Sequence, residues 1–147
     1  MGITVRKLNE HELDWANECY ARIDFIASAP SDYIAVAEVA GRATGLGRVA
    51  EICHGIGELG GMCVFPEYRG KGIAGLLIDH LIDCAGLDNL YCLPFQELRT
   101  LYESKGFFLH AADETVPEKI LQKHDWCNHH YRKPVLLMYR RSLCEAA

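Results

Sequence analysis

Residues 61–75 contain the part of the sequence that is best suited to binding a phosphate. An apolar stretch leads into a glycine-rich turn, and a second apolar stretch at helical spacing follows. The first turn of a helix presents unpaired backbone N–H groups and the positive end of the helix dipole. Gly70 and Gly72 let that backbone approach an anion closely, and Arg69 and Lys71 add positive charge. The pattern predicts a pyrophosphate-binding turn, with an ordinary strand-to-helix turn as the alternative.

The same turn also fits the G-x-G-x-x-G pattern of dinucleotide-binding folds, through Gly70, Gly72 and Gly75. In those folds the glycines follow the first strand directly, and a ribose-binding acid comes about 20 residues later. Here residues 66–69 intervene, several strand candidates come earlier, and no βαβ repeat follows, although Asp88 stands near the place of the acid. A dinucleotide-binding domain is therefore the second interpretation.

Two motifs that follow one another along the chain resemble those of the GNAT superfamily of N-acetyltransferases. Residues 69–74 read R-G-K-G-I-A and match that superfamily's Q/R-x-x-G-x-G/A signature, and Val64, Pro66 and Tyr68 match its usual lead-in. Residues 101–107 read L-Y-E-S-K-G-F, like the family's L-Y-E-x-x-G-F. Two motifs in order at a suitable separation are more specific than either motif alone.

The resemblance implies a mixed α/β fold of the GNAT type, in a single domain over residues 1–147. Its centre would be a mostly antiparallel, splayed sheet of about six or seven strands flanked by helices. The activity implied is transfer of an acetyl group from acetyl-CoA to a primary amine by direct attack. A non-catalytic module that binds or senses acyl-CoA on the same fold is the alternative. Family members often form homodimers, so a homodimer is a further expectation.

The resemblance places the cofactor on one strand and on the turn that follows it. Backbone groups of Met62, Cys63 and Val64 would hydrogen-bond the pantetheine arm and polarise the thioester carbonyl. Because the backbone makes these contacts, a cysteine at position 63 is compatible with the role. The pyrophosphate contacts carry over to Arg69, Gly70, Lys71, Gly72, Ile73, Ala74 and Gly75.

The resemblance also suggests two catalytic residues. An amine arrives mostly protonated, so a base must remove a proton. Glu58 lies six residues before Val64, where several family members place a glutamate, and the alternative is a solvated strand residue. Tyr102 matches the family tyrosine that protonates or hydrogen-bonds the leaving thiolate, and the alternative is a tyrosine that only packs under the cofactor. Glu67 and Tyr91 are weaker substitutes for these two roles.

One position departs from the family pattern. The family often has an asparagine seven residues before its tyrosine, and here that place holds Phe95. Together with Cys92, Phe95 can reshape the acyl pocket, so the acyl group can differ from acetyl. The sequence does not identify the acceptor, and the alternatives are polyamines, aminoglycosides, amino acids, peptide N-termini and lysine side chains.

Several other residues suggest chemistry that we do not assign to them. Four residues near the C-terminus have the types of zinc ligands: His124, Cys127, His129 and His130. A single cysteine without a paired partner is a weak zinc pattern, so we predict no metal and expect a helix end or a wall of the substrate pocket. A cysteine nucleophile paired with a histidine is also conceivable, at Cys63, Cys92 or Cys127. Free buried cysteines that only pack are far commoner.

The elements that must position these residues follow from hydrophobic periodicity and from cap and turn residues. Asn9 and Glu12 resemble a capping box, Gly41 and Arg42 a hairpin turn, and Gly106 a helix C-cap. The return strand after the hairpin carries glycines at 45 and 47, which should loosen it. The predicted strands are 3–7, 32–40, 44–52, 58–65, 87–93, 107–109 and 134–141. The predicted helices are 9–26, 72–84, 95–105 and 118 to about 124 or 126.

Composition limits the class of protein. The chain has 147 residues, of which 50% are hydrophobic and 24% charged, which suits one folded domain. A net charge of −5 gives no basic surface for nucleic acid, and no apolar run approaches the ~20 residues of a membrane span. The start of the chain lacks the apolar core of a signal peptide, and the odd count of 7 cysteines does not suggest a disulfide framework. We therefore predict a cytoplasmic location.

Overall fold

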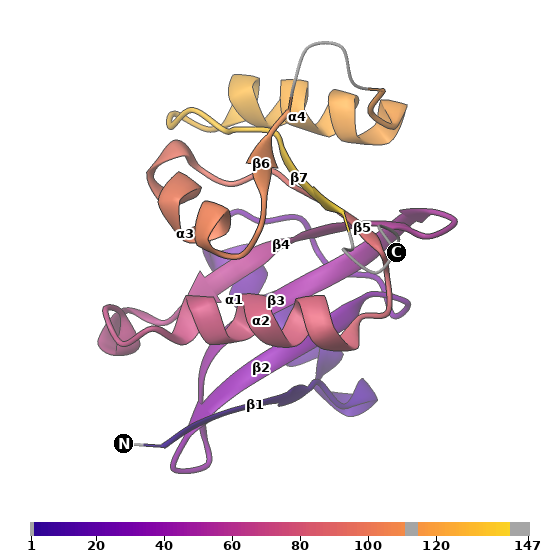
Figure 1. The fold of residues 1–147 in the computed structure, drawn as a ribbon. Helices are drawn as coiled ribbons and strands as arrows, with labels where there is room; N and C mark the ends of the chain where they lie inside the picture. Colours follow the sequence, from indigo (N-terminus) through magenta and orange to yellow (C-terminus); the bar gives the residue numbers. More distant parts are fainter. Residues whose placement is uncertain (1, 111–114, 142–147) are drawn as a thin grey trace. The chain divides into compact units, whose positions relative to one another are not determined.

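The computed structural model describes residues 2–110 and 115–141, and the order of elements along the chain is the one expected from the sequence (Figure 1). The strands are β1 Ile3–Lys7, β2 Tyr33–Val39, β3 Arg42–Cys53, β4 Ile56–Val64, β5 Asn89–Cys92, β6 Phe108–Leu109 and β7 Met138–Arg141. The α-helices are α1 Leu13–Arg22, α2 Ile73–Cys84, α3 Arg99–Ser104 and α4 Glu118–His130. Short 3-10 helices precede three of them: η1 Glu10–Glu12, η2 Pro66–Tyr68 and η3 Gln96–Leu98.

The strands form a mixed, mostly antiparallel sheet of 7 strands in the order β1-β2-β3-β4-β5-β7-β6. The pairs β1–β2, β2–β3, β5–β7 and β6–β7 are antiparallel, and β4–β5 is parallel. This arrangement confirms the fold class predicted from the sequence.

The chain divides into two compact units. One comprises residues 1–50 and 61–86, and the other comprises residues 51–60 and 87–147. Strand β4 belongs to both units, because it passes from the second into the first between Gly60 and Gly61.

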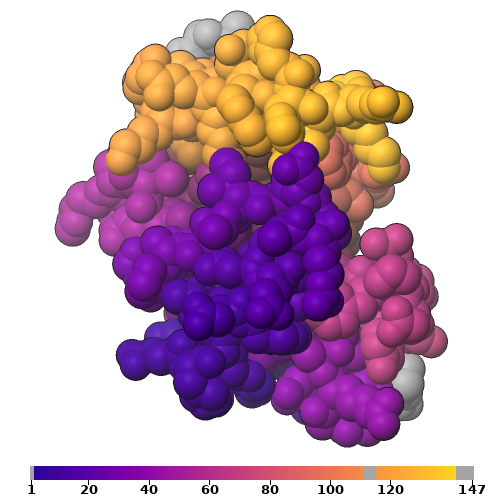
Figure 2. Space-filling view, turned by 180° about the vertical axis from the view of Figure 1, so that it is seen from behind, coloured from indigo at the N-terminus to yellow at the C-terminus, as the bar shows by residue number. Residues whose placement is uncertain are grey.

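In the first unit, α1 and α2 cover opposite faces of the strands (Figure 1). The indigo segment that contains α1 lies toward the viewer in Figure 2. Leu46 of β3 belongs to the buried cluster that includes Tyr20 of α1. Its neighbours Gly45 and Gly47 face the other way, where an added Cβ would lie 3.4 Å from Leu77 and 3.0 Å from a methyl group of Leu81. These glycines do not loosen β3 as expected, because they allow α2 to pack closely on it.

In the second unit, α4 packs on one face of the strands through Ile120, which clusters with Leu137 and Tyr91. The turn after α3 is held by Arg140 of β7, whose Nε donates to the carbonyl of Lys105 at 3.0 Å. The next residue, Gly106, has a φ of +90° and ends the helix, as the sequence predicted.

Several element boundaries differ from the sequence prediction. Helix α1 ends at Arg22 and not near residue 26, because Asp24 takes a φ of +59° that no helix continues. Helix α4 runs to His130, past its expected end, and β7 begins only at Met138. The hairpin turn lies one residue earlier than expected, since Ala40 and Gly41 are the residues with positive φ.

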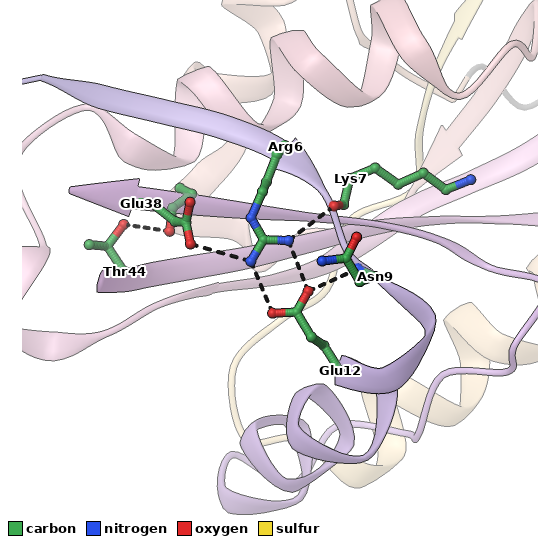
Figure 3. A network of polar contacts seen from close by, with 7 residues as sticks. Arg6, Lys7, Asn9, Glu12, Glu38 and Thr44 are labelled. Atoms are coloured by element: carbon green, nitrogen blue, oxygen red, sulfur yellow. Dashed lines mark hydrogen bonds and ion pairs between the residues drawn. The ribbon is translucent and has the colours of Figure 1, made fainter. Parts of the chain in front are cut away.

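An ion-pair network joins the first strand, the start of the first helix and β2 (Figure 3). The Arg6 guanidinium donates to both oxygens of the Glu12 carboxylate at 2.8 and 2.9 Å, and to Glu38 at 3.3 Å. The backbone N–H of Asn9 also donates to Glu12 at 2.9 Å, which is the glutamate half of the predicted capping box. These hydrogen bonds, first those from Arg6 and then that from Asn9, lower the pKa of the Glu12 carboxyl to about 2.

Two further observations bear on the class of protein. Within residues 2–110 and 115–141, no helix combines the length and the apolar composition needed to traverse a bilayer. The cysteines in this part of the chain are free thiols.

We predict that Glu12→Gln lowers the free energy of unfolding at neutral pH by about 1 kcal/mol, since the pair is partly exposed to water that screens it. The pKa of Glu12 is lower in the folded chain than its ordinary value of 4.5, so the stabilisation is present above that pH and is lost as the pH falls towards 2. Urea unfolding of both proteins across this pH range measures the difference. The exposed Glu10→Gln is the control, and an equal loss in that variant would contradict the assignment.

Candidate functional site

The predicted phosphate-binding turn lies in the first unit, between the end of β4 and the start of α2. Gly70 and Gly72 have φ angles of +78° and +81°, a left-handed conformation that favours glycine. A Cβ added at either position would meet no heavy atom within 4 Å. The two glycines therefore serve the turn's conformation and leave its surface open, and no neighbouring group requires them.

The first turn of α2 is free to bind an anion. Gly72 is its N-cap residue, so no side chain caps the helix, and its first turn holds no acidic residue. The backbone N–H of Leu76 donates to the Gly72 carbonyl at 3.3 Å, while the N–H groups of Ile73, Ala74 and Gly75 precede the first intrahelical bond. Three N–H donors and the positive end of a helix of 12 residues together favour a phosphate group.

The two cations of the turn differ in their surroundings. Arg69 Nε donates to the carbonyl of Val64 at 3.1 Å, so this side chain ties the turn back to the end of β4. Lys71 is exposed between the two glycines. Arg69 thus has a structural contact, which the sequence pattern did not predict, alongside the charge that it contributes.

Strand β4 extends beyond its pairing with β5. The parallel register ends at Leu59 and Cys92, and Met62, Cys63 and Val64 come after it. All three of these residues are partly buried. Burial raises the pKa of the Cys63 thiol, which disfavours a thiolate nucleophile at this position.

Gly61 is closely surrounded where β4 enters the first unit. Its φ is +60°, and an added Cβ would lie 2.8 Å from both Arg48 Nε and the Tyr20 hydroxyl. Arg48 is buried, donates to the Ile26 carbonyl at 2.8 Å and to Ser28 Oγ at 2.6 Å, and lies 4.4 Å over the Tyr20 ring. This cation–π stack lies against β4 at Gly61, immediately before the predicted cofactor residues.

Glu58, the predicted base, lies in the second unit and has a partner there. Its side chain is 9% exposed, and both carboxylate oxygens accept from Lys123 Nζ of α4, at 3.0 and 2.8 Å. A solvated strand residue was the alternative, and the burial of Glu58 argues against it. The ammonium compensates the charge of a carboxylate that would otherwise be costly to bury.

Tyr102, the predicted acid, is also in the second unit and is almost completely buried on α3. Its ring makes an edge-to-face contact with Phe107 at 5.5 Å between centroids. Burial raises the pKa of the Tyr102 hydroxyl, and the Cys92 thiol and the Glu58 charge add to this effect. The hydroxyl therefore stays protonated at neutral pH and is suited to donating a hydrogen bond.

Phe95, which replaces the family asparagine, takes part in aromatic packing. Its ring contacts Tyr131 edge-to-face at 5.4 Å, and the Lys133 ammonium lies 5.8 Å from the ring centre. Phe95 also bridges to Val135 across the sheet. Its ring is thus held by the chain after α4.

The histidines near the C-terminus belong to the end of α4. His124 Nε2 hydrogen-bonds the Val135 carbonyl at 2.8 Å, and His130 stacks on Trp126. In the part of the chain that the structure describes, no three histidine, cysteine or acidic side chains gather where they could hold a metal ion. These contacts fit the helix-end interpretation of this cluster.

Sequence patterns did not single out Lys123 or the pair of Arg48 and Tyr20. Lys123 is 65 positions from Glu58 and is one charged residue among several on a surface helix. No local pattern marks it, because the contact exists only when α4 packs beside β4. The sequence contains a weak indication for Arg48. A cation between the apolar residues of a strand needs a partner if it is buried.

Comparisons with known proteins identify the family of the chain. Residues 30–108 match the family model described as the acetyltransferase (GNAT) domain. A search of curated proteins gives no match.

Solved structures with the same fold are distant in sequence. N-acetylglutamate synthase from Neisseria gonorrhoeae, complexed with coenzyme A and N-acetyl-glutamate, is 17% identical with a TM-score of 0.71, and the match covers 96% of this chain but only 35% of that one. A Mycobacterium tuberculosis protein in complex with CoA is 16% identical, with a TM-score of 0.72 and coverage of 95% and 99%. The ribosomal-protein-S18-alanine N-acetyltransferase from Escherichia coli is 17% identical, with a TM-score of 0.67 and coverage of 97% and 96%.

We predict that Gly61→Ala destabilises the chain by about 3 kcal/mol, because alanine strains the left-handed backbone and its Cβ clashes with Arg48 and Tyr20. Urea unfolding monitored by circular dichroism measures the loss. Gly60→Ala is the matched control, since the nearest atom to its Cβ is Glu58 Oε2 at 3.5 Å, an ordinary contact. Equal effects of the two substitutions would show that the stack of Arg48 on Tyr20 does not constrain Gly61.

Proposed function

Because the chain belongs to the GNAT acetyltransferase family, we propose that it transfers an acetyl group from acetyl-CoA to a primary amine by direct attack on the thioester. The observation that carries the proposal is the open turn before α2, where Gly70 and Gly72 expose the helix N-terminus and leave its N–H groups for a phosphate. A pyrophosphate is the part of coenzyme A that such a turn recognises.

The first unit supplies the cofactor contacts in this proposal. Backbone N–H groups at the start of α2 bind the pyrophosphate, and Arg69 and Lys71 add positive charge around it. Backbone groups of Met62, Cys63 and Val64, which lie past the end of the β5 pairing, hydrogen-bond the pantetheine arm and the thioester carbonyl. Coenzyme A in two of the similar structures supports this assignment.

Glu58 is the general base in the proposed reaction. It accepts a proton from the acceptor's ammonium group, which leaves the nitrogen lone pair free to attack the carbonyl carbon. Burial suits the role, because a desolvated carboxylate interacts more strongly with a cation than an exposed one. Lys123 holds the carboxylate in one orientation through both oxygens.

Tyr102 stabilises the leaving group in the same reaction. The carbon–sulfur bond breaks as the amide forms, and the sulfur leaves as a thiolate that needs a donor. The raised pKa of Tyr102 means that its hydroxyl gives a hydrogen bond to the sulfur more readily than it gives up the proton. The final proton on the sulfur then comes from the acceptor nitrogen.

The acceptor is proposed only as a class. The similar structures include enzymes named for glutamate, for a ribosomal protein's alanine and for spermidine, all of which present an amine. A negative net charge suits a cationic amine. Free thiols fit a reducing compartment, and we propose the cytoplasm as the location and a homodimer as the assembly.

The Lys123–Glu58 ion pair favours a second candidate function. A carboxylate already bound through both oxygens by a lysine is what a non-catalytic acyl-CoA sensor would retain as a structural pair. The sensor would bind acetyl-CoA through the same turn and would acetylate nothing. Turnover of an amine by the purified chain separates the two functions.

We predict that acetyl-CoA at 100 times its dissociation constant raises the free energy of unfolding by about 2.7 kcal/mol. Thermal unfolding under reducing conditions with acetyl-CoA, CoA, NAD or no ligand measures this effect. Gly72→Ala should weaken the stabilisation, because its Cβ lies where the phosphate approaches. Gly41→Ala is the matched control, with a φ of +77° in an open hairpin turn and hence the same intrinsic strain. Stabilisation by NAD alone would instead indicate the dinucleotide-binding alternative.

We predict that Glu58→Gln lowers kcat for amine acetylation by about a hundredfold or more while acetyl-CoA binding is retained, because glutamine accepts no proton. Tyr102→Phe should lower kcat by about a hundredfold, since it removes one donor to the leaving sulfur. Steady-state rates on an amine panel, with thermal shifts as the binding readout, measure both. Glu51→Gln, an exposed carboxylate of the same unit, is the control. Undiminished turnover in Glu58→Gln would remove Glu58 from the mechanism.

A further inference from the structure

The ion pair between α4 and β4 places a primary amine against the proposed base. Lys123 Nζ donates to both oxygens of Glu58 at 3.0 and 2.8 Å, and the Lys123 side chain is 32% exposed. Within the described residues, these two bonds are the only polar contacts of either side chain. Lys123 thus has one partner, and that partner is the group assigned to deprotonate the acceptor.

A general base acts on a proton that lies within about 2.6–3.2 Å of it, measured between heavy atoms. Lys123 Nζ, at 3.0 and 2.8 Å from the two Glu58 oxygens, lies within that distance. A lysine side chain is itself a primary amine and belongs to the acceptor class proposed above. We propose that the chain acetylates itself at Lys123, an inference that rests on the proposed function.

The reaction balances with acetyl-CoA as the one co-reactant. Lys123 Nζ, as an ammonium, gives one proton to the Glu58 carboxylate, and its lone pair forms a bond to the thioester carbonyl carbon. The carbon–sulfur bond breaks, and the sulfur keeps the electron pair. A second proton leaves the nitrogen and ends on the sulfur, so the products are acetyl-lysine and CoA. Glu58 returns its proton to the solvent.

Because Lys123 is partly buried and paired, catalysed self-acetylation can be distinguished from uncatalysed acetylation by acetyl-CoA. Spontaneous acetylation by a thioester favours exposed lysines that are free of ion pairs. Lys119 lies one turn earlier on α4 and is exposed, whereas Lys123 is partly buried and paired. Uncatalysed reaction would therefore modify Lys119 before Lys123, and reaction at Glu58 would reverse that order.

The experiment incubates the purified full-length chain with acetyl-CoA and no added amine, and follows acetylation by intact mass and peptide mapping. We expect one acetyl group per chain at Lys123, with Lys119 modified at least about a hundredfold more slowly, as general-base catalysis implies. The first-order rate should not change when the protein is diluted, because acceptor and base belong to one chain. Lys123→Arg, which keeps the ion pair, and Glu58→Gln should both lose the modification, while Lys119→Arg should keep it.

The same samples are tested for acetyl-CoA binding by thermal shift and for acetylation of an amine panel. Amine turnover without modification of Lys123 would overturn self-acetylation and leave the proposed function intact. Modification of Lys119 and Lys123 at similar rates, unchanged in Glu58→Gln, would also overturn it. Absence of both binding and turnover would overturn the proposed function and this inference together. A folded thermal transition in Lys123→Arg shows that its loss of modification is chemical.

Discussion

The parallel ladder between β4 and β5 covers four residue pairs, from Ile56–Asn89 to Leu59–Cys92, and β4 continues beyond it for Gly60 to Val64. Backbone N–H and C=O groups require partners wherever they are buried. On the paired part of β4 the neighbouring strand supplies them, and there the strand carries the buried carboxylate of Glu58. On the continuation, β5 supplies none. The end of this ladder therefore separates the part of β4 that carries Glu58, the proposed base, from the part that carries the proposed cofactor contacts.

Two buried charged side chains near this strand, Glu58 and Arg48, have different partners. Glu58 is buried and has a single lysine partner, so its environment is sensitive to whatever approaches that lysine. Arg48 is equally buried but receives carbonyl and hydroxyl acceptors and an aromatic ring, with no carboxylate partner in the described structure. An arginine with these partners holds its neighbours in place. The first arrangement suits chemistry, and the second fixes the backbone at Gly61 just before the residues that the cofactor would contact.

Glycines in the first unit have separate physical purposes that composition alone does not distinguish. Gly45 and Gly47 lack a side chain because α2 and Met62 come too close for one. Gly61 meets both requirements at once, since it has a positive φ and close neighbours. Gly70 and Gly72 have positive φ and empty surroundings, as Gly41 has in its hairpin turn, and they differ from it because they directly precede the first turn of α2.

The sequence by itself determined the order of the elements, the sheet class, the position of the glycine turn before α2 and the identity of the family. These depend on local spacing, on glycine and proline positions and on two contiguous motifs, all of which lie within a few residues of one another. It also pointed to Glu58 and Tyr102, by their places relative to those motifs. Element ends were less certain, because the left-handed turn at Asp24 and the extension of α4 to His130 depend on packing and not on local propensity.

Only the tertiary structure decided what surrounds each candidate. It paired Glu58 with Lys123, closed Tyr102 away from water, and stacked Arg48 on Tyr20. These contacts join residues tens of positions apart, and their energies come from burial and from the low polarity of the interior. Burial and low polarity arise only when the strands and helices have packed, which is why no pattern along the chain could have revealed that the Lys123 amine lies against the Glu58 carboxylate.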